Sequence, residues 1–308
     1  MDMAELRHIA TATGELRTGE SMRKHTSWRT GGVAARAYFP AGLEDLAAFL
    51  RSGDPAEPLI FVGLGSNLLV RDGGIDATVV FTHGLLNRVD LEPRAGGVPL
   101  VYAEAGVASP KVARFACTHH LRGAEFLAGI PGTLGGALAM NAGCYGSETW
   151  DIVESVTTLT RSGEMRTRPP ADYDIAYRHV ALQAGAQEEE FFVAARLRLR
   201  SGDGEEGRRL IKQLLQKRIA SQPLDQPNAG SVFRNPPGDH AARLIESCGL
   251  KGCTIGGAQV SPKHANFIVN LGGASARDIE QLIGHVQDTV EARCGVRLER
   301  EVRIVGKE

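Results

Sequence analysis

The 308-residue sequence lacks the features that mark several large protein classes. Acidic and basic residues nearly cancel to a formal net charge of -1, so no overall field favours nucleic acid or an anionic membrane. No run approaches the ~18 uncharged apolar residues that a membrane helix needs. The first twelve residues include Asp2, Glu5 and Arg7 and no apolar core, unlike a signal peptide. We therefore expect a cytoplasmic protein that binds neither nucleic acid nor membrane.

Cysteine is scarce, and its spacing matches no known framework. The five cysteines are odd in number and scattered, which fits reduced thiols in a cytosol. Cys248 and Cys253 are the closest pair, yet no neighbouring Cys or His completes a zinc-site spacing. We expect no metal site and interpret the cysteines as small buried hydrophobic residues.

Glycine, in contrast, is concentrated in a stretch without any charge. Residues 129–146 contain six glycines among small apolar residues. Glycine permits unusual backbone angles and close approach to the main chain. We interpret the stretch as tightly wound backbone whose free N–H groups surround an anion. The alternative is a buried crossing of two strands.

A second glycine-rich segment, residues 63–74, follows an expected buried strand over 58–62. A strand followed by Gly-x-Gly suggests the dinucleotide fingerprint, but that motif needs a third glycine and a helix. Here residues 68–70 have the composition of a strand. A phosphate-cradling loop, with Ser66 and Asn67 adding side-chain donors, is the better interpretation.

The remaining pattern predicts alternating helices and strands in two or three domains. Residues 1–20 are expected to be helical, and the first ~80 residues to form a small β-α-β unit. A polar hinge over 201–207 predicts a domain boundary. Further strands are expected at 33–39, 152–160, 191–199, 255–257, 266–270 and 302–305, a β-rich region at 77–107, and helices at 43–50, 109–120, 208–221, near 244 and at 276–294.

One polar segment stands out near the C-terminus. Residues 228–236 (the serine segment) place Ser231 after a glycine and before Arg234 and Asn235, with prolines on both flanks. This composition is typical of a rigid, donor-rich turn, although a solvated loop is an equal alternative. Taken alone, Arg178, Glu246, Lys251 and the charges over 299–303 fit solvated surface. His264 fits a packed histidine and a ligand equally well.

Taken together, these motifs resemble the family of UDP-N-acetylenolpyruvoylglucosamine reductases. The resemblance runs from about residue 23 to residue 306. Its motifs, in family order, are residues 65–70, 129–136 with 141–143, 177–178, 229–236 and 301–303. The two glycine-rich segments alone would imply only the wider FAD-binding fold of vanillyl-alcohol-oxidase-like enzymes.

The resemblance implies an α+β fold. A two-lobed FAD-binding domain of the vanillyl-alcohol-oxidase/PCMH type would comprise residues 1–80 and 81–205, followed by an α+β substrate-binding domain over 206–300. The last strand, 301–308, would return to the FAD-binding region. The FAD pyrophosphate would lie on the first glycine loop (residues 63–67) and the second glycine loop (residues 129–143). The implied cofactor-binding residues are Gly63, Leu64, Gly65, Ser66, Asn67, Leu68, Gly129, Ile130, Pro131, Gly132, Gly135, Gly136, Asn141, Ala142 and Gly143.

The resemblance also implies a reaction in peptidoglycan precursor synthesis. NADPH would reduce FAD, and a hydride would then pass to the β-carbon of UDP-N-acetylglucosamine enolpyruvate, giving UDP-N-acetylmuramate. Ser231 would donate the proton to the α-carbon, with Arg178 and Glu301 as the other catalytic residues. We expect a monomer of the subtype that lacks the extra substrate-covering tyrosine loop. The implied substrate contacts are Arg234, Asn235, Lys251 and His264.

Two residues depart from the family pattern. Val180 stands where a serine is common, and Leu64 stands where a glycine is frequent, which is tolerable if its φ stays negative. Two other functions compete with the reductase. One is a flavin oxidase of the same fold acting on an alcohol or sugar, and the other is a non-enzymatic FAD- or nucleotide-binding regulator.

Overall fold

The computed structural model describes residues 12–183 and 189–308, which form two compact units. The first unit takes its described residues from 1–17, 37–63 and 78–216, and the second consists of 18–36, 64–77 and 217–308. The expected helix over 1–20 is wrong where it is described, because Glu15–Ser21 forms strand β1. Residues 15–21 offer a single large apolar side chain, too little for a helical stripe. Residues 1–11 lie outside the described part.

Four strands form a sheet in the order β1, β2 (Val33–Phe39), β5 (Ile75–Phe81) and β3 (Leu59–Val62). Strands β3 and β5 run parallel. Helix α2 (Leu43–Ser52) follows β2, as its apolar spacing predicts, and buries Leu46 and Leu50 in a cluster with Tyr38. The predicted β-α-β succession is confirmed.

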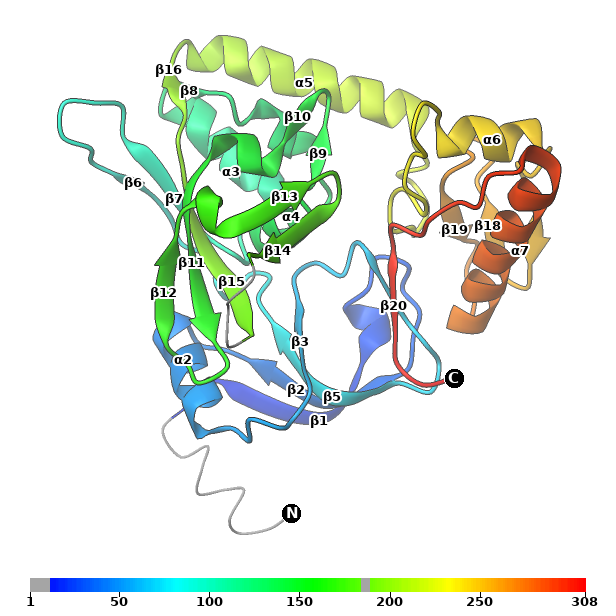
Figure 1. Ribbon diagram of the computed structural model, residues 1–308, viewed down its shortest axis with the longest axis horizontal. Coiled ribbons are helices and arrows are strands. Elements are labelled where there is room, and N and C mark those ends of the chain that lie inside the picture. The colour runs from blue at the N-terminus through cyan, green and yellow to red at the C-terminus, as the bar shows by residue number, and fades with distance from the viewer. Residues whose placement is uncertain (1–11, 184–188) are drawn as a thin grey trace. The chain divides into compact units, whose positions relative to one another are not determined.

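The larger sheet of the first unit has five strands (Figure 1). Helices α3 (Ser109–Thr118) and α4 (Leu134–Ala139) pack with the 3-10 helix η2 (Glu125–Gly129) over Val101, Ala195 and Leu197 to form the main core. The strands, in order, are β12 (Met165–Arg168), β11 (Val153–Thr160), β15 (Glu190–Leu197), β7 (Leu100–Glu104) and β6 (Val89–Glu92).

Short pairs of strands complete the first unit. The shorter pairs are β8 (Leu121–Arg122) with β16 (Arg200–Ser201), and β9 (Gly143–Cys144) with β10 (Ser147–Glu148). Between η4 (Pro170–Asp172) and β15 lies a hairpin of β13 (Tyr173–Ala176) and β14 (His179–Leu182). The expected hinge over 201–207 is wrong, because helix α5 (Gly204–Ser221) begins within it. The carboxylate of Asp203 accepts the amide of Glu205 at 2.8 Å and so caps this start.

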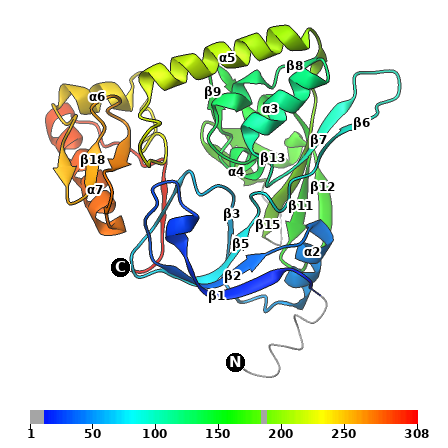
Figure 2. The ribbon, with the colours of Figure 1, turned by 180° about the vertical axis from the view of Figure 1, so that it is seen from behind.

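The second unit places helices α6 (Ala241–Ser247) and α7 (Ala276–Cys294) beside a three-stranded sheet, as Figure 2 shows from behind. The predicted helix over 276–294 is confirmed. Its start is held by a capping box of Ser275 and Asp278, and Asp72 accepts the amides of Ala276 and Arg277, each at 3.0 Å. The strands of that sheet are, in order, β17 (Thr254–Ile255), β18 (Ala258–Val260) and β19 (Ile268–Asn270). A separate pair is formed by β20 (Arg303–Val305), which runs parallel to β4 (Leu68–Val70).

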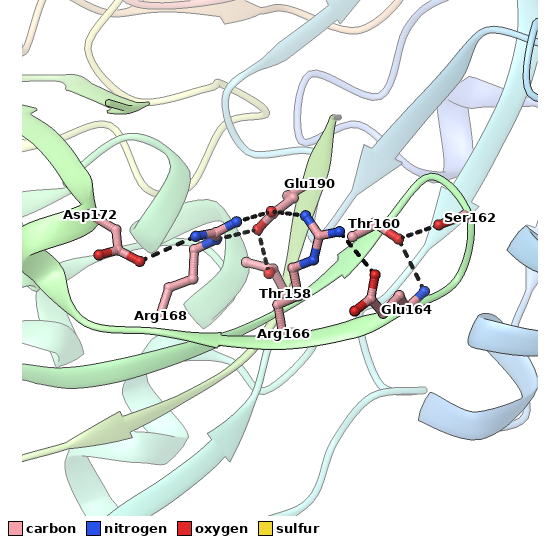
Figure 3. Close-up of polar contacts among 8 residues, drawn as sticks. All are labelled: Thr158, Thr160, Ser162, Glu164, Arg166, Arg168, Asp172 and Glu190. Atoms are coloured by element: carbon pink, nitrogen blue, oxygen red, sulfur yellow. Dashed lines mark hydrogen bonds and ion pairs between the residues drawn. The ribbon is translucent and has the colours of Figure 1, made fainter. Parts of the chain in front are cut away.

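A buried carboxylate joins the edge of the five-stranded sheet to the base of the β13–β14 hairpin (Figure 3). The Glu190 side chain is 2% exposed and accepts hydrogen bonds from Arg168, Arg166 and Thr158 at 2.5–3.1 Å. Arg168 also reaches Asp172, directly before the hairpin, at 3.2 Å. The bonds from Arg168 lead the contacts that lower the pKa of Glu190 to about 2.

Replacing this carboxylate tests its contribution to stability. We expect Glu190→Gln to lower the free energy of unfolding at pH 7 by about 2 kcal/mol, because two guanidinium groups lose their charged partner. The folded-state pKa is depressed, so the wild-type advantage is complete above the ordinary value of 4.5 and disappears as the pH falls towards about 2. Denaturant melts of wild type and variant between pH 7 and pH 3 measure this difference in the free energy of unfolding.

The control for this experiment is Glu189→Gln, whose side chain is 63% exposed beside Arg161. We expect that variant to change stability by less than about 0.5 kcal/mol. Equal losses in both variants, or a Glu190→Gln difference that stays constant in acid, would contradict the assignment.

Candidate functional site

The first glycine loop presents unused backbone donors. The amides of Leu64, Gly65 and Ser66 donate to no protein acceptor within residues 12–183 and 189–308. Gly65 has φ +63°, a conformation suited to glycine, and Leu64 keeps a negative φ as required. Strand β4 follows, so the dinucleotide fingerprint is excluded here. Consecutive unpaired amides around a left-handed glycine form an anion-binding nest.

A segment that sequence reasoning did not assign to the site forms one wall of this loop. Ser27 donates its amide to the Gly65 carbonyl at 3.1 Å, and a side chain at Gly65 would overlap the carbonyl oxygen of His25. The indole of Trp28 is fully buried and donates to Ile268. The polar turn ending in Gly31 and Gly32 was the only signal for this role.

The second glycine loop is closely packed, and several of its backbone amides are already bonded to protein rather than available to a ligand. The amides of Gly132, Leu134 and Gly135 all donate to protein carbonyls at 2.9 Å, so the expectation of free amides is wrong for them. A Cβ at Gly135 would lie 2.8 Å from the Ala105 side chain. One at Gly63 would overlap Thr133, so within the first unit the start of the first loop touches the second.

The remaining predicted positions of the two loops also have defined surroundings. Gly129 and Ile130 are buried beside Tyr145 and Cys144, whereas Pro131 and Gly136 are exposed. Ala142 donates its amide to Ala137, and Leu68 begins the buried strand β4. The loops thus contain both buried residues and exposed residues that a ligand could contact.

Arg178 lies at the turn of the β13–β14 hairpin with φ +55°. Its guanidinium donates to the carbonyls of Asn141 and Gly143, both at 3.3 Å, and stacks 4.8 Å from the centre of the Tyr177 ring. The Asn141 side chain is buried and donates to Ala176 on the same hairpin at 3.3 Å. Hydrogen bonds in both directions therefore connect the second glycine loop to Arg178 and its hairpin. Val180 packs against the main core.

Within the second unit, Ser231 and Glu301 are neighbours. The Glu301 amide donates to the Val232 carbonyl at 2.8 Å, and the Arg234 amide donates to Glu299 at 2.9 Å, so the serine segment pairs with the chain before β20. Asn67 of the first glycine loop donates its side chain to the Glu301 carbonyl at 3.1 Å. The Ser231 hydroxyl is half-buried and bonds to no protein group in the described part of the chain.

Asn266 holds the serine segment and was not identified from the sequence. Its side chain is buried, accepts the Phe233 amide at 3.0 Å and donates to the Phe233 carbonyl at 2.8 Å. Its own carbonyl accepts the Val232 amide at 2.9 Å. A polar amide at the first position of the expected strand over 266–270 was the available signal.

The four expected substrate contacts differ in their surroundings. Arg234 lies 3.8 Å from the Glu299 carboxylate, and the Asn235 side chain caps helix α6 by accepting the Ala241 amide at 3.1 Å. Lys251 donates to Glu246 at 2.8 Å.

His264 is the most defined of the four. Its Nδ1 accepts the Asn266 amide at 3.3 Å, and burial, reinforced by the charge of Lys251, lowers its pKa. The neutral ring therefore has Nε2–H available as a donor. Within the described ranges, no three His, Cys, Asp or Glu side chains gather to hold a metal, and no helix is long and apolar enough to cross a membrane.

Two family models match different parts of the chain. Residues 34–168 match the family model of an FAD binding domain, and residues 222–305 match that of the UDP-N-acetylenolpyruvoylglucosamine reductase C-terminal domain. The reductase of Thiobacillus denitrificans is 59% identical, covering 96% of this chain and 93% of its own. That of Nitrosospira multiformis is 56% identical over 99% and 94%.

A solved structure agrees with these relatives. The crystal structure of UDP-N-acetylenolpyruvylglucosamine reductase from Thermus caldophilus has 32% identity and a TM-score of 0.79, covering 95% of this chain and 99% of its own. The fold class is thus α+β, with an FAD-binding domain and a C-terminal domain of the reductase type. The chain belongs to the UDP-N-acetylenolpyruvoylglucosamine reductase family.

Proposed function

We infer that this protein is an FAD-dependent oxidoreductase that uses NADPH to reduce UDP-N-acetylglucosamine enolpyruvate to UDP-N-acetylmuramate, in peptidoglycan precursor synthesis. The relatives' shared name and the two matched domains support this activity. One structural observation supports it at the level of residues: a backbone ladder holds the serine segment beside Glu301, and the Asn67 side chain of the first glycine loop donates to the Glu301 carbonyl.

The residues present fit FAD. The free amides of Leu64, Gly65 and Ser66 suit a pyrophosphate, and the absence of a Cβ at Gly63 and Gly65 lets the loop pack closely against Thr133 and His25. The exposed positions of the second glycine loop, Pro131 and Gly136, would add further contact surface for the cofactor. When bound, FAD supplies the hydride chemistry, taking a hydride from NADPH and giving it to the enolpyruvyl β-carbon.

Three side chains would serve the substrate during the reduction. Hydride addition beside the carboxylate increases the negative charge on that group, and Arg178 would meet it with a fixed, always-charged fork. Glu301, if protonated, would donate a further hydrogen bond. Each such donor is worth about 3 kcal/mol, or about two powers of ten in rate. The Ser231 hydroxyl, which bonds to no protein group in the described residues, would give its proton to the α-carbon.

Four residues of the second unit are proposed to bind the nucleotide-sugar portion. Arg234 and Asn235 adjoin the proton donor in sequence. Burial and the charge of Lys251 keep His264 neutral by lowering its pKa, and both side chains offer donors for a diphosphate or uridine.

The domain assignment also stays a proposal: residues 1–80 and 81–205, with the return of 301–308, for FAD, and 206–300 for the substrate. The pairing of β20 with β4 supports that return. We further propose a cytoplasmic monomer, consistent with five free cysteines.

Anaerobic stopped-flow spectroscopy tests the function. The purified FAD-loaded protein is reduced with NADPH and then mixed with UDP-N-acetylglucosamine enolpyruvate. Rapid flavin reoxidation without oxygen supports the reductase. Indifference to this substrate together with oxidation by molecular oxygen would instead support the flavin oxidase, and absence of any turnover would support a binding protein.

We predict that Ser231→Ala separates the two half-reactions. Flavin reduction by NADPH should stay within about twofold, whereas reoxidation by substrate should slow by at least about a hundredfold, because only the second step needs the proton. Ser231→Cys, which keeps a side-chain proton, should recover part of the rate. The exposed Ser221, which bonds to the Lys217 carbonyl of its own helix, provides the control Ser221→Ala. A parallel fall of both half-reactions would falsify the proton-donor role.

We also predict that Gly65→Ala weakens flavin binding by more than tenfold, because the new Cβ would collide with His25 and distort the nest. The matched control is Gly96→Ala, with φ +66° and open space around the Cβ, which carries only the left-handed strain of about 1 kcal/mol. Fluorescence titration of the apoprotein with FAD measures both. Similar affinities in the two variants would exclude this loop as the cradle.

A further inference from the structure

Two cysteine sulfurs of the second unit lie in contact although 46 positions separate them in the sequence. The Sγ atoms of Cys248 and Cys294 are 3.6 Å apart. Cys248 directly follows helix α6 and is 4% exposed, whereas Cys294 ends helix α7 and is partly exposed. Both are free thiols, and the sequence had indicated Cys248 and Cys253 as the closest pair.

The surrounding structure fixes this contact. Helices α6 and α7 share one hydrophobic core that includes Cys248, and Arg293 donates to the Cys248 carbonyl at 2.9 Å. The guanidinium of Arg243 also interacts electrostatically with Cys294. Burial raises the pKa of Cys248, so the more exposed Cys294 is the sulfur that meets an oxidant first.

We propose that Cys248 and Cys294 are a redox site that closes to a reversible disulfide when the protein meets hydrogen peroxide. The Cys294 thiol releases its proton, the thiolate attacks one peroxide oxygen, and the O–O bond breaks. The departing hydroxide takes up that proton, so a sulfenic acid and one water result. The Cys248 sulfur then attacks the sulfenic sulfur, the S–O bond breaks, and a second water carries away the thiol proton. Two thiols thus lose two electrons, which reduce one peroxide molecule.

The geometry requires little movement. A disulfide has an S–S distance of about 2.05 Å, so the two sulfurs must move about 1.5 Å closer to form the bond. The bond would enclose residues 249–293, including Lys251, His264 and Asn266. Closing so long a loop restricts the unfolded chain, so the oxidised unit should resist unfolding more than the reduced one.

Mild peroxide treatment of the full-length, FAD-loaded protein tests the proposal. We expect an intact mass lower by two hydrogen atoms, a cross-linked peptide pair containing both cysteines, and a melting temperature raised by about 5 °C. Dithiothreitol should reverse all three changes. Mass spectrometry, peptide mapping and a thermal melt give the three readouts.

Variants distinguish this pair from general thiol oxidation. Cys248→Ser and Cys294→Ser should each abolish the mass loss and the thermal shift, whereas Cys253→Ser, a cysteine of the same unit, should keep both. Oxygen addition without a cross-link, a cross-link between other cysteines, or a cross-link that persists in Cys294→Ser would overturn the proposal.

Discussion

The backbone ladder between the serine segment and the chain before β20 determines how the second unit presents its candidate site. Glu301 and Arg234 both donate their amides across it. Neither segment is long enough to form a regular sheet, yet the ladder brings Ser231 and Glu301 together from distant parts of the chain. Since β20 then pairs with β4, the same short stretch also fixes the first glycine loop. A break in this ladder would separate the proposed proton donor from the loop that is proposed to hold the flavin.

Asparagine side chains hydrogen-bond to peptide groups that the short strands leave without a partner. Asn67, Asn141 and Asn266 each bond to the backbone of a segment far away in sequence. An asparagine side chain offers both a donor and an acceptor, so it can satisfy a peptide group that has no partner strand. Because buried polar groups are costly when unpaired, these contacts give the irregular segments defined positions. The candidate site is thus built on loops that have the hydrogen bonding of regular structure.

The accuracy of the sequence predictions depended on where each element's stabilising contacts lie. The strand at 33–39 and the helix at 276–294 were predictable because their apolar spacing and caps are local. Strand β1 was not, because its pairing with β2 is a tertiary contact, and α5 begins inside an apparently flexible polar run because Asp203 caps it. The site motifs were identifiable from residue types, but the roles of Trp28 and Asn266 depend on partners far along the chain.

Glycine content alone could not distinguish an anion nest from close packing. In the first glycine loop the unpaired amides remain available to a ligand, whereas in the second the amides of Gly132 and Gly135 are already bonded to protein carbonyls. The carbonyls of Asn141 and Gly143 instead accept from Arg178. The two loops therefore differ in what they offer: the first has backbone donors for an anionic ligand, and the second has backbone acceptors that orient the Arg178 guanidinium. That difference matches a reaction that needs both a held diphosphate and a fixed guanidinium.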